Sequence, residues 1–360
     1  MRKLLYRILL VVNILFAIAL LISYLAVNIS PVDFALPAFF GLAYPYLLLI
    51  NILIAITWAA LLRIEALISV LVIAAGFNHL LNYMNFGKHS GDLEGTMKVM
   101  SYNVRLFNYF EDKDNSNSEK RVFDFLKAQQ PDILCLQEFL GSGNPDQNER
   151  VVNTALGGKY YTHMKLVRNG KNRFYGIATY SKFPIIGKGE IIHPGSSSMS
   201  IYSDVVIEKD TFRIFNNHLQ SFRLKSIESS FFEEMTTPDD KETLGEIKII
   251  SVSLKKGFVR RAIQSQLVKL QISLSPYPVI VAGDFNDTPV SYSYRLIRKG
   301  LNDSFVTSGY GAGFTYKGNY PPNRIDYILY DNALESRHFD IIKVRYSDHY
   351  PVVAWLRKKD

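Results

Sequence analysis

Polar side chains suited to acid–base and metal chemistry recur at the ends of apolar, β-rich segments of this 360-residue chain. Asn103 ends the segment 97–103, His218 ends 212–218, and Asp284 follows the run 279–283. The full set comprises Asn103, Glu138, His218, Asp284, Asn286, Asp326, Asp348 and His349. Alone, a carboxylate after a strand is usually a turn or helix cap, and a lone histidine is usually structural. Strand ends that meet at one rim, however, would place the whole set in one cleft.

The side-chain types in this set favour one class of chemistry. Carboxylate and amide oxygens without thiolates suit a hard, octahedral cation, so we expect Mg²⁺ or Mn²⁺. Two histidines beside carboxylates can supply a proton acceptor and a hydrogen-bond donor near neutral pH. No activated serine, cysteine or threonine accompanies them, so water is the expected nucleophile.

The segments that carry these residues predict strands and helices of a mixed α/β fold. Residues 97–103 and 133–137 read as strands, and residues 118–130, which Pro131 ends, read as the helix between them. Further β-rich runs cover 175–180, 203–207, 212–216, 279–282 and 325–329. Many follow one another without a helix between them, which favours two mixed sheets packed face to face over one parallel sheet.

In order and spacing, these segments resemble the endonuclease/exonuclease/phosphatase superfamily. The resemblance rests on the S-x-N, Q-E, N-x-H-L, G-D-F-N and S-D-H segments, and it covers roughly residues 96–357. It implies a four-layered α/β sandwich in which two mixed sheets are flanked by helices. The superfamily includes DNase I-like nucleases, abasic-site endonucleases, sphingomyelinases and inositol-polyphosphate 5-phosphatases.

The resemblance also implies a role for each matching residue. Glu138 would be the principal metal ligand with Asn103, and Asp348 would help with metal or water. Asp284 would orient or deprotonate the attacking water, and Asn286 would hold the scissile phosphate. His349 would be the catalytic histidine, Asp326 would fix its tautomer, and His218 would donate to a phosphate oxygen. These last three complete the expected catalytic set of His349, Asp284, His218, Asp326 and Asn286.

One segment departs from the abasic-site endonucleases. Their catalytic tyrosine aligns most simply with Phe174, and Tyr175 lies one step away. A one-residue shift turns a strand side chain to the opposite face of the sheet. We therefore assign Tyr175 no catalytic role and disfavour abasic-site repair.

The first 87 residues have a different composition. Asp33 is the only formal charge between residues 8 and 62, and residues 66–87 carry none. Three segments are candidates for membrane helices, at about 8–27, 36–62 and 66–83, since about 20 apolar residues cross a bilayer. Two spans, or a cleaved signal peptide at the first segment, are the alternatives. The predicted organisation is a membrane anchor over 1–87, a linker over 88–96 and a catalytic domain over 97–360.

Basic residues predict the orientation of this anchor. Arg2, Lys3 and Arg7 precede the first span and Arg63 follows the second, whereas the loop between them carries only Asp33. The positive-inside rule then places the N-terminus in the cytoplasm. With three spans the catalytic domain lies outside the cytoplasm, and with two spans it lies in the cytoplasm. We expect the membrane to be the bacterial inner membrane.

Two further features complete the sequence predictions. Residues 222–258 exceed an ordinary connection and predict either a lid or a flexible insert, in which Phe231 and Phe232, before Glu233 and Glu234, could mark an interfacial element. Cys135 lies in an apolar run and is expected in the core. The formal net charge of +8 suits an anionic partner without choosing between phosphates and an anionic membrane.

The function expected from these observations is hydrolysis of a phosphodiester by a membrane-anchored, Mg²⁺-dependent enzyme. The anchor favours a lipid or small-molecule substrate, because it raises the concentration of lipid at the active site. An extracytoplasmic DNA or RNA nuclease of the same superfamily and a phosphomonoesterase are the enzymatic alternatives, and a non-enzymatic membrane binding module is a minor one. The expected partners are the lipid bilayer and the phosphoester substrate, with no obligate protein partner.

Overall fold

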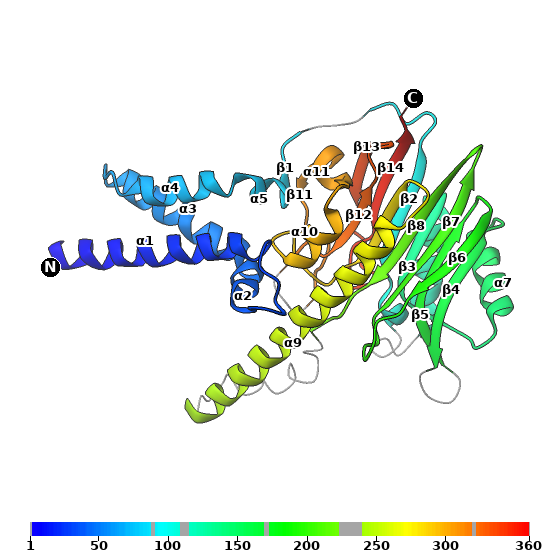
Figure 1. Cartoon of the computed structure of the whole chain (residues 1–360), viewed down its shortest axis with the longest axis horizontal. Helices are drawn as coiled ribbons and strands as arrows, with labels where there is room; N and C mark the ends of the chain where they lie inside the picture. Colours follow the sequence, from blue (N-terminus) through cyan, green and yellow to red (C-terminus); the bar gives the residue numbers. More distant parts are fainter. Residues whose placement is uncertain are drawn as a thin grey trace. The chain divides into compact units, whose positions relative to one another are not determined.

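The computed structural model describes residues 2–87, 91–108, 115–168, 173–222, 240–318 and 322–359 (Figure 1). The chain forms two compact units. The larger comprises Asn82–Leu219, Leu267–Asn286 and Ile297–Asp360. The smaller comprises Met1–Leu81, Gln220–Gln266 and Asp287–Leu296.

Two six-stranded sheets make up most of the larger unit. The first has the order β13 (Leu334–Ile341), β14 (Val352–Lys358), β2 (Met97–Asn103), β3 (Ile133–Gly141), β5 (Phe174–Ser181) and β4 (Tyr161–Arg168). The second has the order β10 (Asn302–Asp303), β12 (Asp326–Tyr330), β9 (Val279–Asp284), β8 (Asp210–His218), β7 (Met199–Ile207) and β6 (Ile185–Ile191). The short strands β1 (Met84–Asn85) and β11 (Gly311–Ala312) pair separately.

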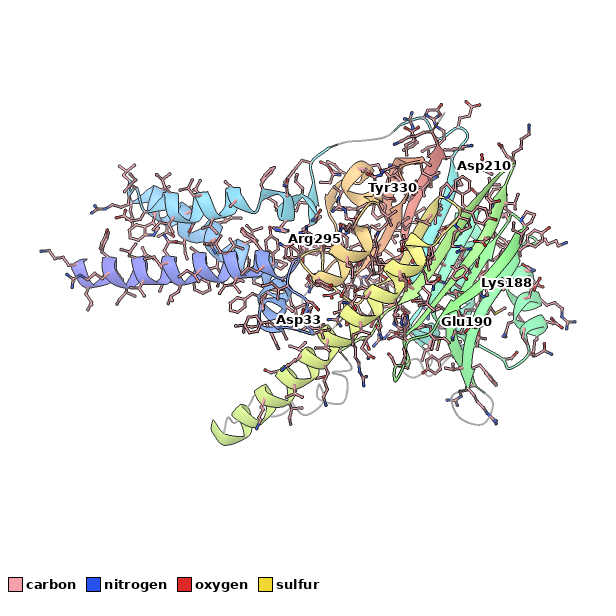
Figure 2. All side chains as sticks on the ribbon, viewed as in Figure 1. Asp33, Lys188, Glu190, Asp210, Arg295 and Tyr330 are labelled. Carbon is pink, nitrogen blue, oxygen red and sulfur yellow. The ribbon has the colours of Figure 1, made fainter. Side chains whose placement is uncertain are left out.

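Both sheets are mixed and have the same pattern of strand directions. Their central pairs, β2 with β3 and β8 with β9, are parallel, and all other pairs are antiparallel. Figure 2 shows Lys188 and Glu190 on the edge strand β6, where charged side chains discourage pairing with another chain. The predicted pair of mixed sheets is confirmed.

The core lies between the two sheets. One cluster of buried apolar side chains joins Val99 and Cys135 of the first sheet to Ile214 and Ile280 of the second. This follows from strand alternation, which turns every second side chain inward. Cys135 is fully buried, as predicted, and burial raises the pKa of its thiol to about 12.

Two helices cover the outer face of the first sheet. The helix α6 (Asn115–Gln129) agrees with the predicted helix over 118–130, and α7 (Pro145–Leu156) was not predicted. Leu126 of α6 and Val152 of α7 pack in one cluster with Leu134 and Tyr180 of the sheet. Asn144 caps α7, because its side chain accepts hydrogen bonds from the backbone of the first helical turn. The remaining short helices are η1 (Arg105–Asn108), α10 (Tyr292–Arg298) and α11 (Ser304–Ser308).

The smaller unit contains the apolar helices of the N-terminal region. They are α1 (Arg2–Leu25), α2 (Leu36–Leu42), α3 (Tyr44–Ala60), α4 (Ala66–Ala75) and α5 (Phe77–Leu81). Among the described residues, one helix is long and apolar enough to cross a membrane alone, at Lys3–Leu25. The second predicted segment is bent by 67° between α2 and α3, and the helix α4 at the third has ten residues. Three membrane spans were predicted. Helix length supports one of them, and it supports two if α2 and α3 together form a single bent span.

Polar side chains join α1, α3 and α4 inside this apolar unit. The Ser69 hydroxyl donates to Asn13 Oδ1 at 2.7 Å and lies 3.3 Å from Asn51 Oδ1. Asn51 in turn donates to the Phe16 carbonyl at 3.0 Å. All three polar side chains are buried. Such contacts hold apolar helices together where no water competes for the hydrogen bonds.

The structure changes the interpretation of residues 222–258. The helix α9 spans Asp240–Ser273, so residues 240–258 are its first half and not a non-helical connection. Residues 223–239 of the segment, with Phe231, Phe232, Glu233 and Glu234, lie outside the described residues. Sequence reasoning placed this helix only from about Arg260, because dense charge and apolar residues on both faces hide its periodicity.

Candidate active site

The site is built on three adjacent strands of the second sheet. In the strand register Asp326 of β12 lies opposite Asp284 of β9, and Asp284 lies opposite His218 of β8. Three potential catalytic side chains therefore stand in one row at the ends of neighbouring strands. Gly283 makes the close spacing possible, because a Cβ atom there would lie 2.0 Å from the Asn217 carbonyl oxygen.

His349 is held against Asp326. Its Nδ1 lies 3.0 and 3.2 Å from the two carboxylate oxygens of Asp326, so this nitrogen carries the proton and donates it. The Tyr316 ring packs edge-on against the imidazole at 5.1 Å. The opposite nitrogen, Nε2, lies 3.8 Å from Asp284 Oδ2.

Charge determines the protonation state of His349. Burial alone would lower the pKa of this imidazole, but the negative charges of Asp326, Asp284 and Asp348 outweigh burial and raise the pKa to about 10. The histidine is therefore a cation at neutral pH. It is suited to donate a hydrogen bond to a phosphate oxygen and not to remove a proton from water.

Asp284 is the buried centre of the site. Its Oδ1 accepts a hydrogen bond from the Asn286 backbone at 2.8 Å. Its Oδ2 accepts from the side-chain amides of Asn103 at 2.9 Å and Asn286 at 3.1 Å. Burial raises the pKa of Asp284 to about 6, against the opposing effect of His349. The carboxylate is thus ionised at neutral pH and has a basicity suited to accepting a proton.

His218 points its Nε2 into the same space. This atom is buried and lies 3.6 Å from Glu138 Oε1 and 3.8 Å from Asp284 Oδ2, both too long for a hydrogen bond. It makes no hydrogen bond in the described structure. A buried polar atom in this state indicates a site for a ligand oxygen.

A β-bulge positions Glu138. From Leu136 to Phe139 three steps along β3 match two along β5, from Ala178 to Gly176. The extra residue bends the strand, and Glu138 has a left-handed backbone with φ of +49°. Its side chain is 30% exposed, so its carboxylate stays accessible while its neighbours are buried. The Asn103 amide lies 3.4 Å from Glu138 Oε1.

Asp348 lies at the edge of the site and forms an ion pair. Its Oδ2 is 3.2 Å from Nε of Arg105, and its Oδ1 is 4.0 Å from His349 Nε2. Sequence reasoning missed Arg105. It follows the S-x-N segment by two positions, and its contact with Asp348 joins residues more than 200 positions apart.

The backbone around Arg105 is unusual. Arg105, Leu106, Phe107 and Asn108 all have positive φ values, between 48° and 57°. This conformation is unfavourable for non-glycine residues and persists only where the surroundings enforce it. Here Phe107 is buried, and the Asn108 side chain donates to the Tyr346 carbonyl at 2.8 Å.

A buried polar network of Gln137 and Asn216 lies behind the site and was not predicted from the sequence. The Gln137 amide donates to Asn216 Oδ1 at 2.8 Å, and Asn216 donates to the carbonyls of Leu136 and Ala178. The network joins β3 and β5 of the first sheet to β8 of the second. Gln137 belongs to the Q-E segment and Asn216 to the N-x-H-L segment, and both segments carry the family resemblance. Membership of these segments is the sequence feature that could have drawn attention to the two residues.

All eight predicted residues thus lie in one unit and are linked by the contacts above. Asn286 adopts a left-handed turn, with φ of +52°, and its amide also donates to the Leu219 carbonyl. Asn103 presents its amide nitrogen to the carboxylates, while its Oδ1 accepts from the Arg105 backbone at 3.0 Å. Tyr175, to which we assigned no catalytic role, packs against a separate apolar cluster of Ile177, Met199 and Ile201.

The donor set fits a hard divalent cation. Asp284, Asp326 and His349 bring ligand atoms within 4.8 Å of one another. In that group, however, Nδ1 of His349 already bonds Asp326. The accessible carboxylate of Glu138 is therefore the better ligand, since it has only a weak contact with Asn103. The described residues around the site offer carboxylate and amide oxygens without thiolate, and such oxygen donors are the ligands that Mg²⁺ and Mn²⁺ prefer.

Comparison with known proteins identifies the family to which the chain belongs. The sequence pattern of the endonuclease/exonuclease/phosphatase family matches residues 100–349. A second pattern, a domain of unknown function, matches residues 6–83. No curated protein matches the chain.

Solved structures share the fold at low sequence identity. A family protein from Leptotrichia buccalis is 18% identical with a TM-score of 0.51, over 72% of this chain and 98% of that one. Humanized D. rerio TDP2 is 16% identical with a TM-score of 0.52, over 74% and 100%. Truncated Caenorhabditis elegans TDP2 is 20% identical with a TM-score of 0.50, over 74% and 100%. The chain belongs to the endonuclease/exonuclease/phosphatase family and is a hydrolase of phosphoester bonds.

Proposed function

We propose that the protein is a membrane-anchored, Mg²⁺-dependent phosphodiesterase that hydrolyses a lipid or small-molecule phosphodiester by attack of water. One observation carries the proposal. Nε2 of His218 and Nε2 of His349 each lie 3.8 Å from the same buried carboxylate oxygen of Asp284. That spacing leaves a place where a phosphate oxygen or a water molecule can contact all three groups.

In this proposal Asp284 accepts the proton of the attacking water. Its pKa of about 6 keeps it ionised, and its other contacts are hydrogen bonds that fix its orientation. His349, held protonated by Asp326, donates to an oxygen on which charge develops. His218 donates to a second phosphate oxygen, and Asn286 helps to position the phosphate.

Glu138 and Asn103 would hold the metal ion. When bound, the ion would withdraw charge from the phosphate and so favour attack. Asn103 would need to turn its Oδ1 away from the Arg105 backbone to act as a ligand. Asp348 would join these ligands only if its ion pair with Arg105 opened.

Membrane anchoring is supported by the apolar unit. The helix Lys3–Leu25 is long enough to cross a bilayer, and the buried contacts among Asn13, Asn51 and Ser69 are of the kind that join membrane helices. With the N-terminus in the cytoplasm, an odd number of spans places the catalytic domain outside. A bound enzyme then meets lipid substrates at high local concentration.

A substrate panel tests the proposal. The purified full-length protein with Mg²⁺ would be assayed against sphingomyelin vesicles, plasmid and nicked DNA, and inositol phosphates, with Glu138→Gln as the inactive control. We expect the lipid or a small phosphodiester to be hydrolysed fastest. Faster cleavage of DNA would favour the nuclease alternative, and no hydrolysis of any substrate would contradict the enzyme proposal.

A further inference from the structure

The first half of α9 packs through one face inside the smaller unit. Phe258 makes edge-on contacts with Phe39 of α2 at 5.2 Å and with Phe222 at 5.3 Å. Arg261 is fully buried on the same side, with its guanidinium 4.1 Å from the centre of the Phe222 ring. Figure 1 shows α9 as one uninterrupted helix. Its first half is therefore attached to the apolar helices and does not form an independent insert.

The opposite face of α9 is apolar but exposed. Ile249, Val252 and Ile263 are 56%, 44% and 44% exposed. At about 100° per residue these three side chains fall within an arc of roughly 60°, and Phe258 points to the other side of the helix. A helix that is apolar on two faces normally packs on both of them. In the described structure only one face is covered.

Basic residues surround this exposed apolar face. Lys256 and Arg260 fall within or beside the same arc, and Lys248 and Lys255 flank it. All four are exposed. The sequence from Lys248 to Ser273 contains no aspartate or glutamate. The face thus combines apolar side chains with uncompensated positive charge.

We infer that this face of α9 lies in the headgroup region of an anionic lipid bilayer. The apolar side chains would enter the boundary between headgroups and acyl chains, and the lysine side chains would reach up to the phosphates. The inference rests on the membrane placement in the proposed function. It adds a second contact with the membrane, made by a helix that continues into the catalytic unit.

A bilayer fits this face better than a nucleic acid does. Nucleic acid binding would use the cations but would leave three aliphatic side chains in water. The contact between Phe258 and Phe39 of α2 also keeps this helix beside the apolar N-terminal helices through which we propose that the protein is anchored. The exposed apolar side chains and the continuity with these helices favour a bilayer over a nucleic acid, and the positive charge favours anionic lipid within it.

Site-specific labelling of the full-length protein in liposomes tests the inference. Cys135 is fully buried, so a cysteine introduced on the surface can be labelled selectively with an environment-sensitive fluorophore. Ile249→Cys and Ile263→Cys report on α9, Leu15→Cys reports on insertion of α1, and Ile186→Cys on β6 is a water-exposed control. Liposomes of phosphatidylcholine with and without phosphatidylserine would carry spin-labelled lipid as the quencher.

We expect the labels at 249 and 263 to be blue-shifted and quenched in phosphatidylserine liposomes, and the label at 186 to be unaffected. In the labelled variants, the further substitutions Lys255→Gln and Lys256→Gln should lower the ratio of membrane-bound to free α9 by about 10- to 30-fold. Quenching at position 15 without quenching at 249 and 263 would overturn the inference and leave the anchor intact. Loss of quenching at position 15 would instead contradict the anchor. A spectral shift of the label at position 249 on adding duplex DNA, but not on adding lipid, would also overturn the inference that α9 binds the bilayer.

Discussion

The role of Asp326 gives the most informative prediction. The Asp326→Asn substitution keeps the shape of the side chain but removes the charge that holds His349 protonated. An ion pair at about 4 Å is worth roughly 4 kcal/mol at an effective dielectric constant of 20, which corresponds to about three pKa units. The pKa of His349, about 10 in the wild type, should therefore fall to roughly 7 or 8.

The pH dependence of kcat/KM measures this change. In the proposed mechanism activity requires ionised Asp284 and protonated His349, so the wild type should become active as pH rises through about 6 and lose activity as pH rises through about 10. In Asp326→Asn the acidic limb should move below 6, because the negative charge of Asp326 helps to raise the pKa of Asp284. The alkaline limb should move down by two to three units. The maximal rate should fall by about 10²- to 10⁴-fold, because the donor is no longer oriented.

Asp210→Asn is a matched control. Asp210 (labelled in Figure 2) forms an ion pair with Lys358 at the surface, at 2.7 Å. Asp210 belongs to the same sheet as Asp326. This variant should keep the wild-type profile. If Asp326→Asn lowered the rate but left the alkaline limb near 10, the assignment of that limb to His349 would be wrong.

Three further variants test other parts of the site. Glu138→Gln should abolish Mg²⁺-dependent hydrolysis and weaken Mg²⁺ binding in calorimetry without lowering the melting temperature, and an unchanged metal affinity would remove Glu138 from the ligand set. Asn216→Leu should destabilise the protein by roughly 2 to 4 kcal/mol in chemical denaturation, because it removes one hydrogen bond of the Gln137 amide and the side-chain donor to two buried carbonyl groups; full stability would mean that the network contributes little. Arg105→Ala should free Asp348 to join the proposed metal ligands and so tighten Mg²⁺ binding in calorimetry, and an unchanged affinity would refute a role of Arg105 in keeping Asp348 from the metal.

Much of the catalytic unit could be predicted from the sequence. The strands at 97–103, 212–216 and 279–282 were readable because apolar, β-rich residues end abruptly in a polar one. The buried position of Cys135 followed from its apolar neighbours. The set of site residues came from a combination of strand-end polarity and family resemblance, since neither a lone Asp326 nor a lone His218 is informative.

The remaining features depend on tertiary contacts that have no local signal. The bulge that exposes Glu138 arises from the mismatch between β3 and β5, and the pairing of Arg105 with Asp348 joins distant parts of the chain. The bend of 67° between α2 and α3 falls inside a run that composition alone reads as one span. The sequence predicts a lid or an insert over the first half of α9, because two apolar faces cancel the amphipathic signal of the helix.

Isotope transfer from solvent tests the central claim most directly. The full-length protein would hydrolyse its best phosphodiester substrate in H₂¹⁸O with Mg²⁺, and both products would be analysed by mass spectrometry. We predict one ¹⁸O atom in the phosphate-bearing product, none in the released alcohol, and no turnover after chelation of the metal or in Glu138→Gln. Label in the alcohol, or undiminished turnover without a divalent cation, would contradict metal-dependent attack of water on phosphorus.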